Sequence, residues 1–101
     1  MFTKKYTYTL IKPDYKKFKQ IQKKSREIYQ EHVNCQFLYF VDRNDELKIT
    51  ELIKFRTLED FNKAQDLDDH RLDDLILEFK DIVDFDSIVE DELIDLNIDE
   101  D

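Results

Sequence analysis

The amino-acid sequence predicts an α+β domain whose elements follow the order β-α-β-β-α-β. Segments with alternating apolar residues, typical of half-buried strands, occur near the N-terminus, in the middle and near the C-terminus. Between them, apolar residues recur at helical spacing in two regions. The chain has 101 residues, the usual length of one domain, and 41% of them are charged.

The first predicted strand and helix are separated by a proline. Tyr6, Tyr8 and Leu10 alternate with other β-forming residues, and the pattern ends before Pro13, which cannot donate to a sheet. From Asp14 to about His32, apolar side chains share one face of a helix and lysines fill the remainder. The apolar positions are Tyr15, Phe18, Ile21, Ile28 and Tyr29.

A hairpin is predicted next. Asn34 is expected to end the helix in the left-handed conformation, because Asn is the usual substitute for Gly at that position. Cys35–Val41 is apolar on both faces, which indicates a strand covered on both sides. The segment Asp42–Glu46 is typical of a turn, and Leu47–Phe55 alternates as the second strand of the hairpin.

The second helical region is predicted in two parts. Thr57–Asp60 resembles a capping box with Asp in place of Glu, so a short helix should begin there. The region is interrupted near Asp66–Asp69, and helical spacing then continues from Leu72 to Val83. Phe85–Leu93 is the last predicted strand. We therefore expect a domain over residues 1–93 and an acidic C-terminal tail over residues 94–101.

Two helices after alternate strands predict the ferredoxin-like arrangement, an antiparallel sheet with both helices on one face. The strand Cys35–Val41 places Phe37, Tyr39 and Val41 on one side and Leu38 and Phe40 on the other, so both faces of the sheet need a cover. A second copy of the same sheet is the simplest cover. We therefore predict a two-fold homodimer, packed sheet to sheet as a dimeric α/β barrel.

The sequence resembles a known family over about residues 2–93. The resemblance rests on the element order, on the segment Phe55–Phe61 and on His70, about fifteen residues after Phe55. The chain is similar to the antibiotic-biosynthesis-monooxygenase-like domains of the dimeric α/β-barrel superfamily. This resemblance implies a cavity between sheet and helices. In enzymatic members it implies oxygenation of electron-rich aromatic compounds without a cofactor, so we expect no cofactor here.

Two functions from different classes follow. The first is a monooxygenase-like enzyme acting on an apolar aromatic small molecule, with Asn62 and His70 as candidate catalytic groups at a pocket mouth. The second is a non-catalytic dimeric module that binds a small ligand or a protein. The residues expected to line a ligand pocket are Tyr6, Tyr8, Tyr39 and Phe55, although the tyrosines could equally be core and dimer contacts.

Metal ligation is weakly supported. His70 lies among aspartates at helical spacing, a pattern that could hold a divalent ion, but acidic residues at a helix N-terminus also complement the helix dipole. His32 and Cys35 form only half of a zinc site, and burial of Cys35 explains it more simply. We expect no metal site.

Composition excludes several classes of protein. The chain has no glycine, which phosphate-binding loops require, and Leu47–Phe55 lacks the signature of an RNA-recognition strand. Ser25 and Ser87 lie in no nucleophile elbow. The longest apolar run, Phe37–Val41, is too short to span a bilayer, and a single cysteine fits a reducing compartment. We therefore expect a cytoplasmic protein that binds neither nucleic acid nor membranes.

Overall fold

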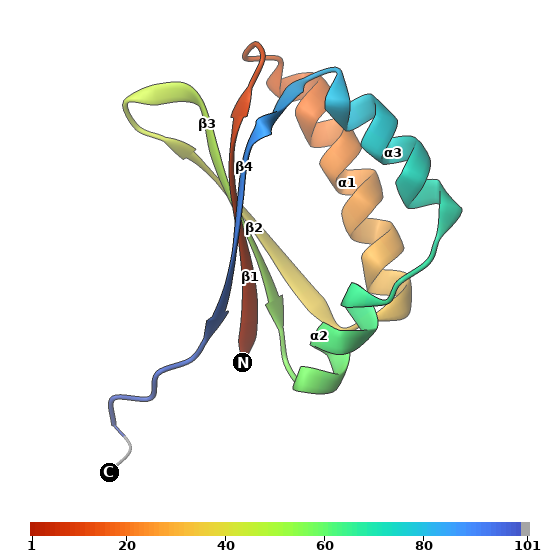
Figure 1. The fold of residues 1–101 in the computed structure, drawn as a ribbon, viewed down its shortest axis with the longest axis vertical. Helices are drawn as coiled ribbons and strands as arrows, with labels where there is room; N and C mark the ends of the chain where they lie inside the picture. The colour runs from red at the N-terminus through yellow and green to blue at the C-terminus, as the bar shows by residue number, and fades with distance from the viewer. Residues whose placement is uncertain (100–101) are drawn as a thin grey trace.

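The structure, a computed structural model, describes residues 1–99 and consists of one antiparallel sheet with helices on one side (Figure 1). Its elements are β1 (Phe2–Leu10), α1 (Tyr15–His32), β2 (Cys35–Asp42), β3 (Asp45–Phe55), α2 (Leu58–Gln65), α3 (His70–Lys80) and β4 (Val83–Ile94). The predicted ferredoxin-like α+β class is confirmed, including the break in the second helical region. None of the helices within residues 1–99 is long and apolar enough to cross a membrane.

The strands lie in the order β2-β3-β1-β4, so the first strand is central and β2 and β4 form the edges. Tyr39, Glu51 and Tyr6 oppose one another across β2, β3 and β1. Because side chains alternate along a strand, these three point to the same face, the one that α1 and α3 cover. The register of the sheet therefore brings a carboxyl group between two tyrosines.

The core lies between the sheet and the helices in two clusters. One gathers Tyr8, Leu10 and Phe18 under α1 and α3. The other surrounds Phe37 and Phe55 near the opposite end of the sheet. Aromatic rings join the layers, and Tyr8 of β1 meets Phe79 of α3 edge to face at 5.4 Å between centroids.

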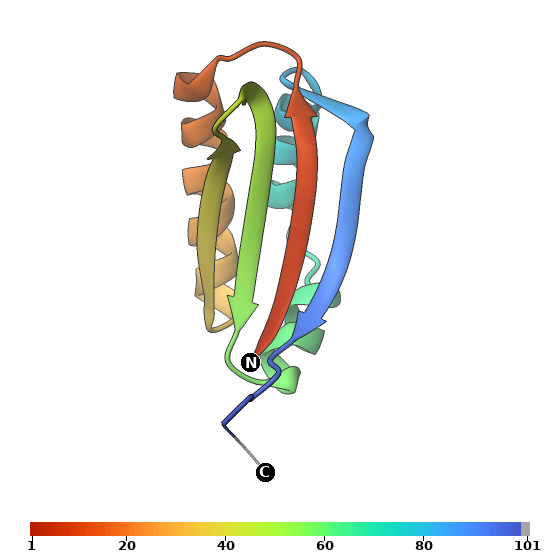
Figure 2. The same ribbon diagram turned by 90° about the vertical axis from the view of Figure 1, so that its left-hand side faces the viewer.

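The other face of the sheet has no helix over it, as Figure 2 shows. One row across this face contains Phe40, Thr50, Thr7 and Val89. Phe40 is 51% exposed and Val89 is 55% exposed. Apolar and threonine side chains thus share a surface that the sequence prediction assigned to a second copy.

The end of α3 differs from the sequence prediction. Helical spacing indicated a helix as far as Val83, but α3 ends at Lys80, and Val83 begins β4. Ile82 donates its backbone N–H to Phe79 O at 3.1 Å and accepts from Ile11 N at 2.8 Å, which joins the turn to β1. Ile82 and Val83 are both buried, so two core positions in a turn and a strand imitated the apolar face of a helix.

The prediction of a left-handed Asn34 is wrong. No residue within 1–99 has a positive φ. The helix ends instead at Val33, whose backbone is extended with φ of −138° and whose N–H donates to Tyr29 O at 2.9 Å. Val33 packs in the core next to Phe37, so burial of its side chain directs the chain from α1 into β2.

Candidate functional site

A cavity of about 320 Å³ lies between the sheet and the helices α1 and α3. This central cavity has a mostly apolar wall, formed by Ile21, Phe37, Ile53, Leu72, Leu75, Ile76, Phe79, Phe85 and Ile88. Its polar groups come from Tyr6, Tyr8, Gln22, Ser25, Tyr29 and Glu51. A volume of this size and a wall of this kind are typical of a site for a small apolar molecule.

Glu51 is the ionisable carboxyl group of this wall. It is 8% exposed, and its Oε1 accepts a hydrogen bond of 2.8 Å from the Tyr8 hydroxyl. Burial raises the pKa of Glu51 to about 7, although the hydrogen bond from Tyr8 lowers it in part. Near neutral pH, Glu51 is therefore present in both protonation states, which suits a group that accepts and returns a proton.

A chain of hydrogen bonds orients the Tyr8 hydroxyl. Gln22 of α1 donates from Nε2 to Tyr8 Oη at 3.4 Å, and Tyr39 donates from its hydroxyl to Gln22 Oε1 at 3.1 Å. Because Tyr8 Oη accepts from Gln22, its own proton points to Glu51. Burial raises the pKa of Tyr8 and of Tyr39, so both remain neutral donors. We call Glu51, Tyr8, Gln22 and Tyr39 the Glu51 network.

Tyr6, the neighbouring cavity residue, lies beside an ion pair formed by a buried lysine and an exposed glutamate. Lys4 Nζ is 2.6 Å from Glu90 Oε1 and donates to Gln65 Oε1 at 2.9 Å. The ammonium group also lies 5.9 Å from the centroid of the Tyr6 ring. Lys4 therefore links β1 to β4 and α2. Because its charge is paired with Glu90, no unpaired cation is left next to the cavity at this position.

The structure separates the residues that the sequence analysis proposed for a ligand pocket. Tyr6 and Tyr8 line the central cavity. Tyr39 lines a groove on the other side of Gln22, between α1 and β2. Phe55 is 2% exposed and packs edge to face against Phe61 at 5.4 Å between centroids, as part of the core.

The two proposed catalytic residues lie on the surface. Asn62 of α2 is exposed and lines an open hollow of about 770 Å³ together with His32. His70 is the first residue of α3 and is also exposed. Neither belongs to the wall of the central cavity that contains Glu51.

Glu51 and Gln22 were not proposed from the sequence. The signal for Glu51 was present, because it is the acidic residue among the inward positions of the Leu47–Phe55 alternation. Gln22 lies beside Ile21 on α1 and carried no comparable signal. Tyr8 and Glu51 are 43 residues apart, so their contact depends on the register of β1 with β3.

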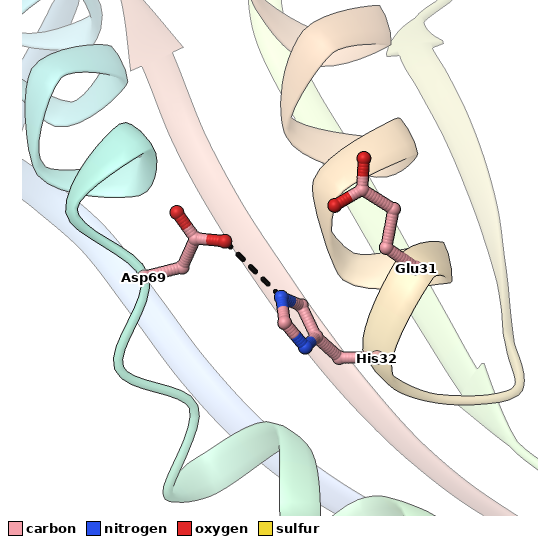
Figure 3. A group of neighbouring side chains, drawn as sticks. All are labelled: Glu31, His32 and Asp69. Atoms are coloured by element: carbon pink, nitrogen blue, oxygen red, sulfur yellow. Dashed lines mark hydrogen bonds and ion pairs between the residues drawn. The ribbon is translucent and has the colours of Figure 1, made fainter.

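A second polar cluster joins α1 to α3 at the surface. His32 Nε2 lies 3.1 Å from Asp69 Oδ2, while Glu31 points to the same space (Figure 3). Arg71 contacts both carboxylates, Asp69 Oδ2 at 2.7 Å and Glu31 Oε2 at 2.5 Å. Hydrogen bonds from Arg71 hold the pKa of Asp69 and of Glu31 below their usual range. We call these four residues the α1–α3 ion-pair cluster.

This cluster includes ligand-type groups but already contains its own cation. One ligand atom each from Glu31, His32 and Asp69 lies within 4.8 Å of the other two. The guanidinium group of Arg71 bonds both carboxylates, and Asp69 also caps α3 by accepting from Arg71 N at 3.0 Å. The sequence analysis grouped Asp69 with His70, whereas the fold pairs it with His32. The contacts assign the cluster a structural role.

Comparison with known proteins relates the fold to solved structures. No family profile matches the sequence, and no curated protein matches it. SnoaB, a cofactor-independent oxygenase from Streptomyces nogalater, superposes with a TM-score of 0.75 at 8% identity, over 95% of this chain and 93% of that chain. The resemblance to monooxygenase-like domains is thus confirmed for the fold.

Two further solved structures share this fold over nearly their whole length. A protein from Agrobacterium tumefaciens has a TM-score of 0.71 at 17% identity, with 97% of this chain and 96% of that chain covered. A protein from Pseudomonas aeruginosa has a TM-score of 0.63 at 15% identity, with 95% and 94% covered. These values establish a common architecture.

Proposed function

We propose that the protein binds an apolar aromatic molecule in the central cavity and oxygenates it without a cofactor, with Glu51 as the proton acceptor. The observation that carries this proposal is a buried carboxyl group, with a pKa of about 7, in an otherwise mostly apolar cavity. The fold shared with SnoaB, a cofactor-independent oxygenase, supports the same class of reaction. Asn62 and His70 are not needed for it.

The reaction that fits this site begins with a proton transfer. A carbon between two aromatic rings, as in an anthrone, is acidic enough to give a proton to the Glu51 carboxylate. The resulting carbanion reduces dioxygen and bonds to it, and protonation gives a hydroperoxide. Loss of water then forms a carbonyl group. Overall, CH2 and O2 become C=O and H2O, so no further reductant is required.

The Glu51 network positions the base. Tyr8 occupies Oε1 of Glu51, and no hydrogen bond within residues 1–99 is made to Oε2, which leaves this oxygen for the substrate. Tyr8 also stabilises the carboxylate form, because its hydrogen bond lowers the pKa that burial raises. The apolar wall limits access of water to the carbanion.

Oxygen uptake with anthrone tests the proposal. Glu51→Gln should lower kcat/KM by about 10² to 10⁴, the usual contribution of a general base. In the unsubstituted protein, kcat/KM should rise with pH through an inflection near the Glu51 pKa of about 7. Glu27→Gln, the same change at an exposed position of α1, is the matched control. Full activity in Glu51→Gln would contradict the role of Glu51.

The alternative is a module that binds a ligand without catalysis. It requires only a fit between the ligand and the apolar wall, so binding would be equal in the unsubstituted protein and in Glu51→Gln, with no oxygen consumed. Calorimetric titration with anthraquinone, a non-oxidisable analogue, measures binding separately from oxygen uptake. Binding without any turnover of a range of anthrones and quinols would favour this alternative.

We also propose that two chains pair through the uncovered face of the sheet. This face presents Phe40, Leu52 and Val89 on three strands, enough apolar surface to favour a cover. Sedimentation velocity should give twice the 12.4 kDa mass of one chain. Leu52→Lys should shift the protein to the monomer, whereas Leu77→Lys on the exposed side of α3 should not. A monomer at micromolar concentration would contradict this pairing.

A further inference from the structure

A groove separate from the central cavity lies between α1 and β2. This α1–β2 groove has a volume of about 370 Å³. Its apolar part comes from Phe18, Tyr39 and Val41, and its basic part from Lys19, Lys23 and Arg26. Gln22 lines both hollows, so its side chain stands in the wall between them.

Where Gln22 lines the groove, both polar atoms of its amide already bond to other residues of the protein. The amide of Gln22 is buried, and its Oε1 accepts from Tyr39 while its Nε2 donates to Tyr8. Val41 at the end of β2 is 50% exposed although its side chain is apolar. A molecule in this groove would therefore gain from an apolar body placed against the strand.

The basic residues of the groove lie along one side of α1. Lys19, Lys23 and Arg26 follow one another at intervals of four and three residues, which places them about one helical turn apart. None of them belongs to an ion pair formed within residues 1–99. Arg26 is near enough to the Tyr39 hydroxyl to offset part of the rise that burial gives the pKa of Tyr39.

We propose that the α1–β2 groove binds an anionic amphiphile, a small molecule with an apolar body and one carboxylate or sulfonate head. The apolar body would lie against Phe18 and Val41, and the head would lie among the three cations, which have no anionic partner in the described chain. The net charge of −9 argues against a polyanion as the occupant, since the rest of the protein would repel it. This second site goes beyond the proposed oxygenation.

Titration calorimetry with dodecanoate below its micellar concentration tests this site. Lys19→Gln, Lys23→Gln and Arg26→Gln combined should weaken binding by about tenfold, a loss of ~1.4 kcal/mol. The control combines Lys12→Gln, Lys16→Gln and Lys24→Gln, which removes the same charge from exposed positions outside the groove. Equal weakening by both sets, or no binding of dodecanoate at all, would overturn the proposal.

Further experiments identify the chemical class of the ligand and the site at which it binds. Ser25→Trp places an indole ring in the central cavity and should leave the affinity for dodecanoate unchanged; loss of binding would assign dodecanoate to that cavity instead. Dodecanol, which lacks the charge, should bind more weakly than dodecanoate, and equal affinity would overturn the role of the cations. Sedimentation with phosphatidylserine-containing vesicles, without binding of free dodecanoate, would indicate a membrane surface and overturn the proposal.

Discussion

The Glu51 network and the α1–α3 ion-pair cluster both join α1 to another part of the fold, yet they change the acidity of their carboxyl groups in opposite directions. Burial without a cation raises the pKa of Glu51 to about 7. Arg71 holds the pKa of Asp69 below its usual range. The difference shows that burial dominates the pKa of Glu51, whereas hydrogen bonds from Arg71 and His32 dominate the pKa of Asp69.

The two clusters also contribute differently to folding. A Glu51 carboxylate costs stability at neutral pH, because folding removes it from water without supplying an opposite charge. The Asp69 carboxylate is favoured by folding, because Arg71 and His32 gather around it only in the folded chain. The Glu51 network keeps a carboxyl group in the core without an opposite charge, and the α1–α3 ion-pair cluster fixes the relative position of two helices.

The largest expected effect is the change with pH in the free energy of unfolding that Glu51 causes. Its pKa is about 7 in the fold against an ordinary value of 4.5, so protonated Glu51 favours the folded state. This contribution is fully present below about pH 4.5 and is lost as the pH rises towards 7, by about 3 kcal/mol in total. The free energy of unfolding in urea of the unsubstituted protein, compared with that of Glu51→Gln, should change by this amount across the window.

The comparison with Glu51→Gln isolates this one group, because the other titrating groups are common to both proteins. Glu27→Gln should run parallel to the unsubstituted protein at every pH, since Glu27 is exposed. A difference between the unsubstituted protein and Glu51→Gln that stayed constant from pH 4.5 to 7 would show that Glu51 titrates normally.

A smaller effect is expected at Tyr8. Tyr8→Phe removes the hydroxyl that bonds Glu51 Oε1 and should cost about 1 to 3 kcal/mol, the usual penalty for a buried polar group left without its partner. It should also raise the pKa of Glu51 above about 7, because the Tyr8 hydrogen bond lowers that pKa. Urea unfolding measures the first effect and NMR titration of the labelled Glu51 carboxyl group the second.

Tyr15→Phe provides the matched change outside the Glu51 network. The Tyr15 hydroxyl donates to the backbone oxygen of Glu46 in an exposed position, so water can replace it. Tyr15→Phe should therefore lower the free energy of unfolding less than Tyr8→Phe does, and it should leave the pKa of Glu51 unchanged. A fall of the Glu51 pKa in Tyr8→Phe would contradict the direction assigned to the hydrogen bond.

The smallest effect is expected in the α1–α3 ion-pair cluster. Asp69→Asn keeps a side chain that caps α3 but loses the charge that Arg71 and His32 contact. Since the pKa of Asp69 is lowered by folding, its stabilisation is present above the ordinary Asp range and is lost as the pH falls through the folded pKa. Thermal unfolding should show a small decrease in Tm at neutral pH and none in strong acid.

Salt separates this electrostatic loss from a change in packing. Surface ion pairs are screened, so the Tm difference for Asp69→Asn should shrink in about 1 M salt, where the Debye length is ~3 Å. The Tm difference for Tyr8→Phe should persist under the same conditions, because its lost hydrogen bond is buried. A salt-independent loss in Asp69→Asn would assign Asp69 to packing or capping instead.

The spacing of apolar residues predicted the strands and their order along the chain, although Cys35–Val41 is apolar on both faces and does not alternate. It failed at Val83, where a buried turn and a strand produced helical spacing. The candidate site was harder to predict. Tyr6 and Tyr8 were correctly placed together on one strand, but Glu51 acquires its unusual acidity only from the packing of α1 and β1 around it.

The central position of β1 has a consequence for biosynthesis. Its bond from Thr9 N to Ser87 Oγ joins residues that are 78 positions apart, so the ribosome must make most of the chain before β4 can close the sheet. At translation rates of 5 to 20 residues per second, the edge of β1 that pairs with β4 stays unpaired for roughly 4 to 16 s. During that interval the nascent chain exposes an unpaired strand edge, and the charged side chains of Lys4 and Lys5 on β1 discourage its association with other nascent chains.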